Sequence, residues 1–377
     1  MLTGDQIMIR DTARQFAQER LAPTAAERDR TGETPRGLLA EMGALGFMGM
    51  TIPEEWGGAG ADTVAYVLAM EEIAGGDGGV STVMSVNNSP VAAALFGYGS
   101  TEQKERFLKP LARGEINAAF SLTEPQAGSD ASNLKTRAEK RGNKYVLNGA
   151  KQFITSGETA DINLMFAVTD PAAGKRGISA FIVPTDTPGY KVVRKEEKLG
   201  QRSSDTCALI LEDMEATPDL LVGQEGEGYR IALANLEAGR IGVAAQAVGM
   251  ARAAYEHAVA YAKERVSFGK PIVEHQAVAF RLADMATQIE AAHQMALNVA
   301  RLKDAGLPCL KEAAMAKLFA SEMAERVCSD AIQVHCGYGY LQDFPVERIW
   351  RDVRVCKIYE GTSDVQKMII SRAIAAE

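Results

Sequence analysis

Cysteine and histidine are scarce in this sequence, and their spacing excludes the usual metal and disulfide frameworks. The 377 residues include five cysteines and four histidines. No Cys-x-x-Cys pair and no His-Glu-x-x-His motif occurs, so we predict neither a metal site nor a disulfide framework. His335 and Cys336 form the only local pair of these types, and we interpret them as packing residues.

An excess of positive charge and a long apolar run are also missing. The formal net charge is −8, whereas a nucleic-acid-binding surface needs clustered Lys and Arg. We therefore expect no nucleic-acid partner. Met1 leads into a polar amphipathic segment, with no signal peptide and no apolar run of membrane length. We expect no membrane association and a cytoplasmic location.

What remains is the composition of an ordinary globular protein, with 46% hydrophobic and 24% charged residues. The chain is too long for one comfortable core, so two or three domains are expected. The pattern of apolar and turn-forming residues changes twice along the sequence. We predict a helical N-terminal domain over residues 1–115, a β domain over 116–225 and a helical bundle over 226–377.

Helical periodicity dominates the first of these segments. Apolar residues recur at helical spacing over 5–21, and the pattern repeats over 37–45 and 62–73. The run Gly75-Gly76-Asp77-Gly78-Gly79 interrupts it. Thr101 begins a segment typical of a capped helix start.

Short apolar or β-branched runs mark the middle segment. They cover 144–147, 162–168, 178–183 and 206–211, and turn pairs such as Asn148-Gly149 separate them. Strands at this spacing predict a compact antiparallel barrel or sandwich.

Long helices return in the last segment. Ala-rich helical patterns cover 231–266, 275–304 and 310–334, and a shorter one covers 362–374. Glycine or proline closes each long run. We predict a four-helix bundle. Its small residues would permit close contacts between subunits, but packing within one chain explains them equally well.

Two motifs carry the chemistry. In 357–363, Glu360 follows the apolar Ile358 and Tyr359 and precedes Gly361. Partial burial would raise the pKa of its carboxyl and make it a better base. An ordinary helix-capping turn would also explain this stretch.

The second motif is a loop rich in hydrogen-bonding groups over 121–130, where Pro125 and Gly128 shape the backbone. It could present N–H groups to a polar ring or phosphate, although a plain surface turn would explain the glycine and proline. Phe153, two positions before Thr155, could cover one face of a planar ligand.

These stretches resemble the acyl-CoA dehydrogenase family over essentially the whole chain. The matching motifs are TEPQAGSD at 123–130, IYEGTS at 358–363 and RVSFGKP at 265–271. Residues around 239–242 and 311–317 resemble the short-chain and short branched-chain members most. No Gly-x-Gly-x-x-Gly follows a strand, so a Rossmann flavin site is not indicated, and this family binds FAD without one.

The resemblance implies an FAD enzyme, usually a homotetramer, with the flavin between the middle and C-terminal domains. It would convert a short straight or 2-methyl-branched acyl-CoA to the trans-2-enoyl-CoA. Glu360 matches the base that removes the α-proton while the β-hydride passes to flavin N5. The Glu360 N–H would polarise the thioester carbonyl. An electron-transferring flavoprotein would accept the electrons.

Matching positions also assign the other site residues. Those implied to contact the cofactor, some of them on a neighbouring subunit, are Phe120, Leu122, Thr123, Gly128, Ser129, Phe153, Thr155, Arg265, Phe268, Gln276, Gln333, Gly337, Thr362 and Asp364. Those implied to contact substrate are Ser129, Glu237, Arg240 and Gly361. For Arg240, an ion pair with Glu237 one helical turn away is the structural alternative to a contact with the CoA nucleotide.

The chain departs from the family at two cofactor positions. Phe153 replaces a common Trp and loses the indole N–H, and Asp364 is shorter than the usual Glu or Gln. Some relatives place their base one residue before the matching Arg; Gly239 stands there and cannot serve. An oxidase or monooxygenase on the same scaffold, or a non-catalytic scaffold protein, are the alternative functions.

Overall fold

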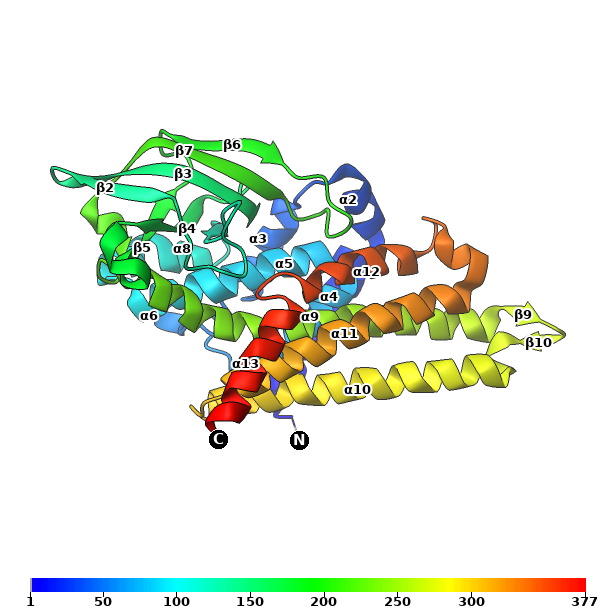
Figure 1. The fold of residues 1–377 in the computed structure, drawn as a ribbon. Coiled ribbons are helices and arrows are strands. Elements are labelled where there is room, and N and C mark those ends of the chain that lie inside the picture. Colours follow the sequence, from blue (N-terminus) through cyan, green and yellow to red (C-terminus); the bar gives the residue numbers. More distant parts are fainter. Residues whose placement is uncertain (1) are drawn as a thin grey trace.

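The computed structural model describes residues 2–377 and divides the chain into helices, a sheet and more helices (Figure 1). Thr3 begins the first helix with a capping box, in which its hydroxyl accepts from the Gln6 N–H and the Gln6 side chain bonds back. The α-helices before the sheet are α1 (Gly4–Phe16), α2 (Ala25–Thr31), α3 (Arg36–Ala44), α4 (Thr63–Gly76), α5 (Gly78–Val86), α6 (Ala93–Tyr98), α7 (Thr101–Gln103) and α8 (Lys109–Ala112).

The predicted break in the glycine-rich run is a single residue wide. Helix α4 continues through Gly75 and Gly76, and only Asp77 adopts an extended backbone. Its carboxylate accepts from the N–H groups of Gly79 and Val80, 2.9 and 3.1 Å away, and so caps α5. Asp77, and not the glycines, therefore interrupts the helix.

The middle segment forms one mixed sheet in the order β6-β7-β3-β2-β4-β5-β8, with β1 paired to β4. Its strands are β1 (Ala118–Ser121), β2 (Arg137–Arg141), β3 (Lys144–Thr155), β4 (Ile162–Val168), β5 (Ile178–Pro184), β6 (Tyr190–Lys195), β7 (Thr206–Ala216) and β8 (Leu221–Val222). The predicted antiparallel pairing holds for most neighbours, but β1 and β2 run parallel to β4, and there the prediction was wrong.

The turn predicted at Asn148-Gly149 is instead part of β3. The register against β7 shifts between Leu147 and Gly149, which is how a strand accommodates an irregular residue without ending. A Cβ at Gly149 would lie 2.4 Å from the Thr136 hydroxyl, so the glycine also permits close approach of the backbone. Strand β3 therefore reaches Thr155.

The C-terminal helices are α9 (Gly228–Glu264), α10 (Gln276–Asp304), α11 (Leu310–His335), α12 (Pro345–Val353) and α13 (Ser363–Ala376), with a small hairpin of β9 (Val266–Ser267) and β10 (Lys270–Pro271) after α9. Helices α9, α10 and α11 are long and lie side by side, whereas the shorter α13 crosses them steeply (Figure 1). The predicted fold class, helical at both ends around a β domain, is confirmed. No helix in residues 2–377 is both long and apolar enough to cross a membrane.

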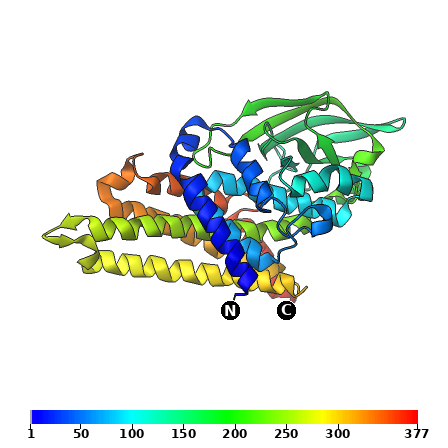
Figure 2. The same cartoon turned by 180° about the vertical axis from the view of Figure 1, so that it is seen from behind.

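The first and last helical segments share one hydrophobic core. Residues of α1, α4 and α5 belong to the same buried cluster as those of α9, α10 and α11. Figure 2 shows α1 and α4 lying against the C-terminal helices from behind. The sheet has a second core with α6, α8 and the first turn of α9. Helix α9 thus contributes to both cores.

Contact between α4 and α9 depends on Gly249. A Cβ there would lie 2.0 Å from the Glu71 carbonyl oxygen. We expect Gly249→Ala to lower the free energy of unfolding by about 1–3 kcal/mol through overpacking. In a helix without such a contact, the same substitution would raise the free energy of unfolding by roughly 1 kcal/mol. Urea titration measures the difference. Gly37→Ala in α3, with no atom within 4 Å of the new Cβ, is the control; equal stability of the two variants would contradict the prediction.

Candidate active site

Glu360 lies in a strained turn directly before α13. Its φ is +53°, and Gly361 follows at +90°. A non-glycine residue in this region costs about 1–3 kcal/mol and persists only where its surroundings hold it. Thr362 caps α13, because its hydroxyl accepts from the Val365 N–H at 3.3 Å. The capping interpretation is therefore correct for Thr362, and the cap helps to hold Glu360 in place.

The Glu360 carboxylate rests against the backbone of α9. A Cβ at Gly239 would lie 1.8 Å from Oε2 and 3.0 Å from Oε1. Oε2 is buried and has no hydrogen-bond partner among residues 2–377. Within the same residues, the Glu360 backbone N–H donates to no protein acceptor. The residue thus offers an unoccupied carboxylate oxygen and an unoccupied N–H.

Burial sets the electrostatics of this carboxyl. Desolvation raises the pKa of Glu360 to about 7, and the positive charges of Arg240 and Lys317 oppose the rise. Arg240 is itself buried, with an Nε that bonds to nothing in the described chain. The ion pair with Glu237, the alternative to a CoA contact, does not form among residues 2–377; Glu237 instead accepts a weak bond from the Cys309 thiol at 3.7 Å. Glu360 is therefore the acidic group with which Arg240 interacts most strongly.

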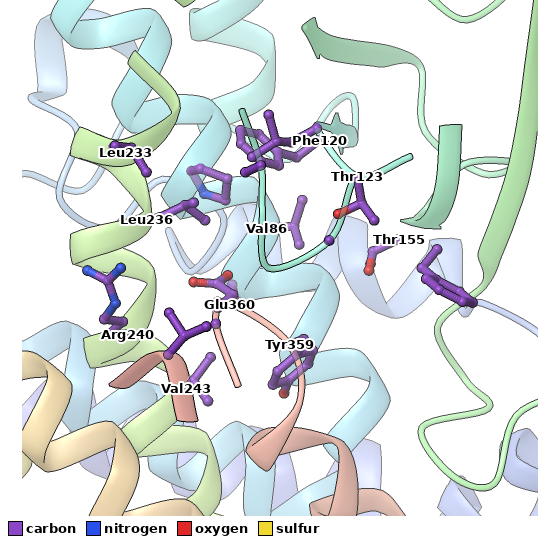
Figure 3. Close-up of a pocket in the computed structure, with 18 of the residues that line it drawn as sticks. Val86, Phe120, Thr123, Thr155, Leu233, Leu236, Arg240, Val243, Tyr359 and Glu360 are labelled. Carbon is purple, nitrogen blue, oxygen red and sulfur yellow. The ribbon is translucent and has the colours of Figure 1, made fainter. Parts of the chain in front are cut away.

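A cavity of about 240 Å³ opens beside Glu360, between the sheet and α9. Figure 3 shows Leu233, Leu236 and Arg240 on one side and Thr123 and Thr155 on the other. The structure brings together here these residues predicted from the sequence: Phe120, Leu122, Thr123, Gly128, Ser129, Phe153, Thr155, Arg240, Glu360 and Gly361.

The 121–130 loop is anchored from inside the sheet. The Lys151 ammonium lies 2.9 Å from Glu124 and donates to the Phe166 carbonyl at 2.6 Å, with both charged side chains almost fully buried. Glu124 also accepts from the Thr136 N–H at 3.1 Å. A plain surface turn has no such anchor. The loop is instead a fixed wall of the cavity.

The position of Phe153 suits stacking on a planar ligand. Its φ is +57° and its side chain is 65% exposed, which is an unusual position for a phenyl ring. Thr123 and Thr155, which also line the cavity, add two hydroxyls. Exposed aromatic surface beside these hydroxyls suits a planar, polar ring such as isoalloxazine.

A second set of predicted residues lies at the far end of α9. Arg265 and Gly337 line a separate cavity of about 400 Å³ with Tyr261 and Tyr338. Phe268, 95% exposed, sits at the tip of the β9–β10 hairpin (Figure 1). The helical rise puts Arg265 about 38 Å from Arg240 along the axis. Within one chain these residues are remote from Glu360, as are Gln276 and Gln333 at the same end.

Two further predicted positions have local partners. Thr362 uses its hydroxyl as the helix cap, and the exposed Asp364 pairs with Lys367 at 3.3 Å. Neither lines the main cavity. Across the residues that the structure describes, no cluster of three His, Cys, Asp or Glu side chains could hold a metal ion.

Sequence reasoning missed a buried polar network below Glu360. The Tyr359 hydroxyl donates to the side-chain Oε1 of Gln246, and the Gln246 Nε2 donates to the Thr82 hydroxyl at 2.7 Å. All three residues line the cavity. Lys317, fully buried on α11, was also missed. The sequence did contain a signal, because Gln246 and Lys317 are polar residues inside Ala-rich runs. A polar side chain that is buried in such a helix must have a hydrogen-bond partner.

Comparison with known proteins agrees with this geometry. Family profiles match residues 3–115 as the acyl-CoA dehydrogenase N-terminal domain, 119–214 as the middle domain and 226–375 as the C-terminal domain. An acyl-CoA dehydrogenase of Bacillus subtilis is 49% identical over 371 residues, 98% of each chain.

Two solved structures superpose over the whole chain and 99% of their own. The first, described as the electron transferring flavoprotein of Acidaminococcus fermentans, has a TM-score of 0.98 at 47% identity. The second, butyryl-CoA dehydrogenase from Megasphaera elsdenii, has a TM-score of 0.97 at 44% identity. With all three domains matched, the chain belongs to the acyl-CoA dehydrogenase family.

Proposed function

We propose that this enzyme oxidises a short straight or 2-methyl-branched acyl-CoA to its trans-2-enoyl-CoA, with Glu360 as the base. The observation that carries the proposal is the Glu360 carboxylate, which borders the cavity, has a free Oε2 and has a pKa of about 7. A base whose pKa lies near the working pH is efficient at taking a proton.

The chain's own groups would act on the substrate as follows. Glu360 takes the α-proton, and its free backbone N–H donates to the thioester oxygen where negative charge develops. The cofactor is FAD, which supplies an oxidant that accepts the β-hydride. Phe120, Thr123, Phe153 and Thr155 would hold its ring, because they line the same cavity as Glu360.

A short acyl chain follows from the polar wall of the cavity. Gln246 hydrogen-bonds there to both Thr82 and Tyr359. A longer chain would have to separate these groups and leave buried donors or acceptors unpaired. The similarity to a butyryl-CoA dehydrogenase supports the same range.

The partners are proposed on similarity. The resemblance to a chain of the Acidaminococcus electron transferring flavoprotein structure favours a flavoprotein of that kind as the electron acceptor. A homotetramer would supply the Arg265 end of one chain to the cavity of another.

Replacing the base tests the proposal directly. Glu360→Gln keeps the shape of the side chain but cannot accept the proton, so turnover should fall by about 10²–10⁴-fold while the flavin absorbance stays. In the parent enzyme, kcat/KM should rise as pH increases through about 7, since the carboxyl must be ionised to act. Glu256→Gln, at an exposed position on α9, is the matched control. Substantial turnover by Glu360→Gln would refute the assignment.

Substrate range provides an independent test. Anaerobic bleaching of the flavin by butyryl-, 2-methylbutyryl-, hexanoyl- and octanoyl-CoA measures it. We expect kcat/KM for the four-carbon chain to exceed that for the eight-carbon chain by at least about tenfold. Equal or faster reaction with octanoyl-CoA would show that the Gln246 wall does not limit the chain.

The third test concerns the contact between Glu360 and α9. Gly239→Ala places a methyl group 1.8 Å from the present position of the Glu360 Oε2, so the two cannot coexist. We expect the carboxylate to be displaced and kcat to fall about a hundredfold, with FAD still bound. Gly97→Ala in α6, which has no atom within 4 Å of the new Cβ, controls for the substitution. Unchanged kcat in Gly239→Ala would contradict the close contact.

A further inference from the structure

Lys317 is a buried cation without an ion pair. Its side chain, on α11, has no exposed surface, and its ammonium donates to the Gly361 carbonyl at 2.8 Å. No carboxylate among residues 2–377 lies within 4 Å of it. Removing a lysine from water without a counter-ion is unfavourable, so neither packing nor ion pairing explains this residue.

A second, neutral donor bonds to the same carbonyl. The Gln366 side-chain amide, from α13, donates to the backbone carbonyl oxygens of Gly361 at 2.8 Å and of Glu360 at 3.3 Å. Lys317 and Gln366 therefore both donate, from two different helices, to the Gly361 carbonyl directly after the strained Glu360. Left-handed backbone at Glu360 persists only with such external support.

We propose that Lys317 is a positioning residue for Glu360: its ammonium holds the Gly361 carbonyl, which keeps the carboxylate against Gly239, and its charge favours the ionised form of that carboxylate. The inference rests on the proposed role of Glu360 as base. Lys317 and Gln366 both donate to the Gly361 carbonyl, but only Lys317 is charged, so only Lys317 can also stabilise the ionised carboxylate.

The charges around the turn are consistent with an electrostatic role for Lys317 that Gln366 does not share. The other titratable groups that face Glu360 or Lys317 are Arg240 on α9, Tyr66 on α4, Glu322 on α11, and Cys356 and Tyr359 before the turn. Of these only Arg240 is a cation. Burial lowers the pKa of Lys317 to about 8, so Lys317 is charged at the pH near 7 where Glu360 ionises.

The test compares Lys317→Met with Gln366→Met in the FAD-loaded enzyme. Infrared difference spectra between pH 5 and 9, referenced to Glu360→Gln, follow the Glu360 carboxyl without substrate. In Lys317→Met the titration should move about one unit to higher pH, which lowers the ionised fraction at pH 7 from about a half to about a tenth. The kcat at pH 7 should fall roughly tenfold or more, because the turn also loosens.

Gln366→Met is the matched control, since it removes a donor from the same carbonyl without removing charge. It should lower kcat and leave the carboxyl titration in place. Lys317→Gln, which keeps a donor but no charge, should recover part of the lost kcat and keep the shifted titration. This variant also preserves the test if Lys317→Met fails to bind FAD.

Two results would overturn the proposal: an unchanged titration in both Lys317 variants, or an equal shift in Gln366→Met. The infrared measurement requires no turnover. If the parent enzyme oxidises no acyl-CoA, the proposed function fails, while the titration still decides the role of Lys317.

Discussion

The burial of one carboxylate against the backbone of α9 governs the arrangement of this site. Desolvation alone would leave Glu360 protonated at neutral pH, and a direct ion pair would hold its pKa low and make it a weak base. The structure adopts neither extreme. Arg240 and Lys317 are buried nearby, yet no cation in the described chain lies within 4 Å of the carboxylate. Two cations at a distance place the pKa near 7.

This balance depends on a rigid frame, and α9 provides it. Three of its glycines permit contacts that any side chain would block: Gly239 with the Glu360 carboxylate, Gly242 with the Tyr66 hydroxyl at 2.7 Å from a would-be Cβ, and Gly249 with the α4 backbone. Each glycine costs the helix about 1 kcal/mol relative to alanine. Since α9 also belongs to both hydrophobic cores, a strained turn packed against it cannot relax without disturbing them.

Sequence patterns were informative where local chemistry decides structure. Glycine and proline marked the ends of the long helices, and apolar runs marked β4 and β5, which are buried along almost their whole length. Patterns failed where tertiary pairing decides. Strand β6 is almost entirely exposed and β2 is charged, so neither has an apolar signature. The parallel pairing of β1 and β2 with β4 arises from distant segments, which no local pattern records.

The predicted cofactor residues fall into two sets, one near Glu360 and one near Arg265. The resemblance assigned both sets to FAD, with Arg265 and Phe268 reaching the cofactor of a neighbouring subunit. Within one chain the two sets lie at opposite ends of α9, about 38 Å apart by helical rise. If both sets contact one FAD molecule, we expect the second set to come from another copy of the chain. In such an assembly we would expect the exposed Phe268 at the hairpin tip to become buried.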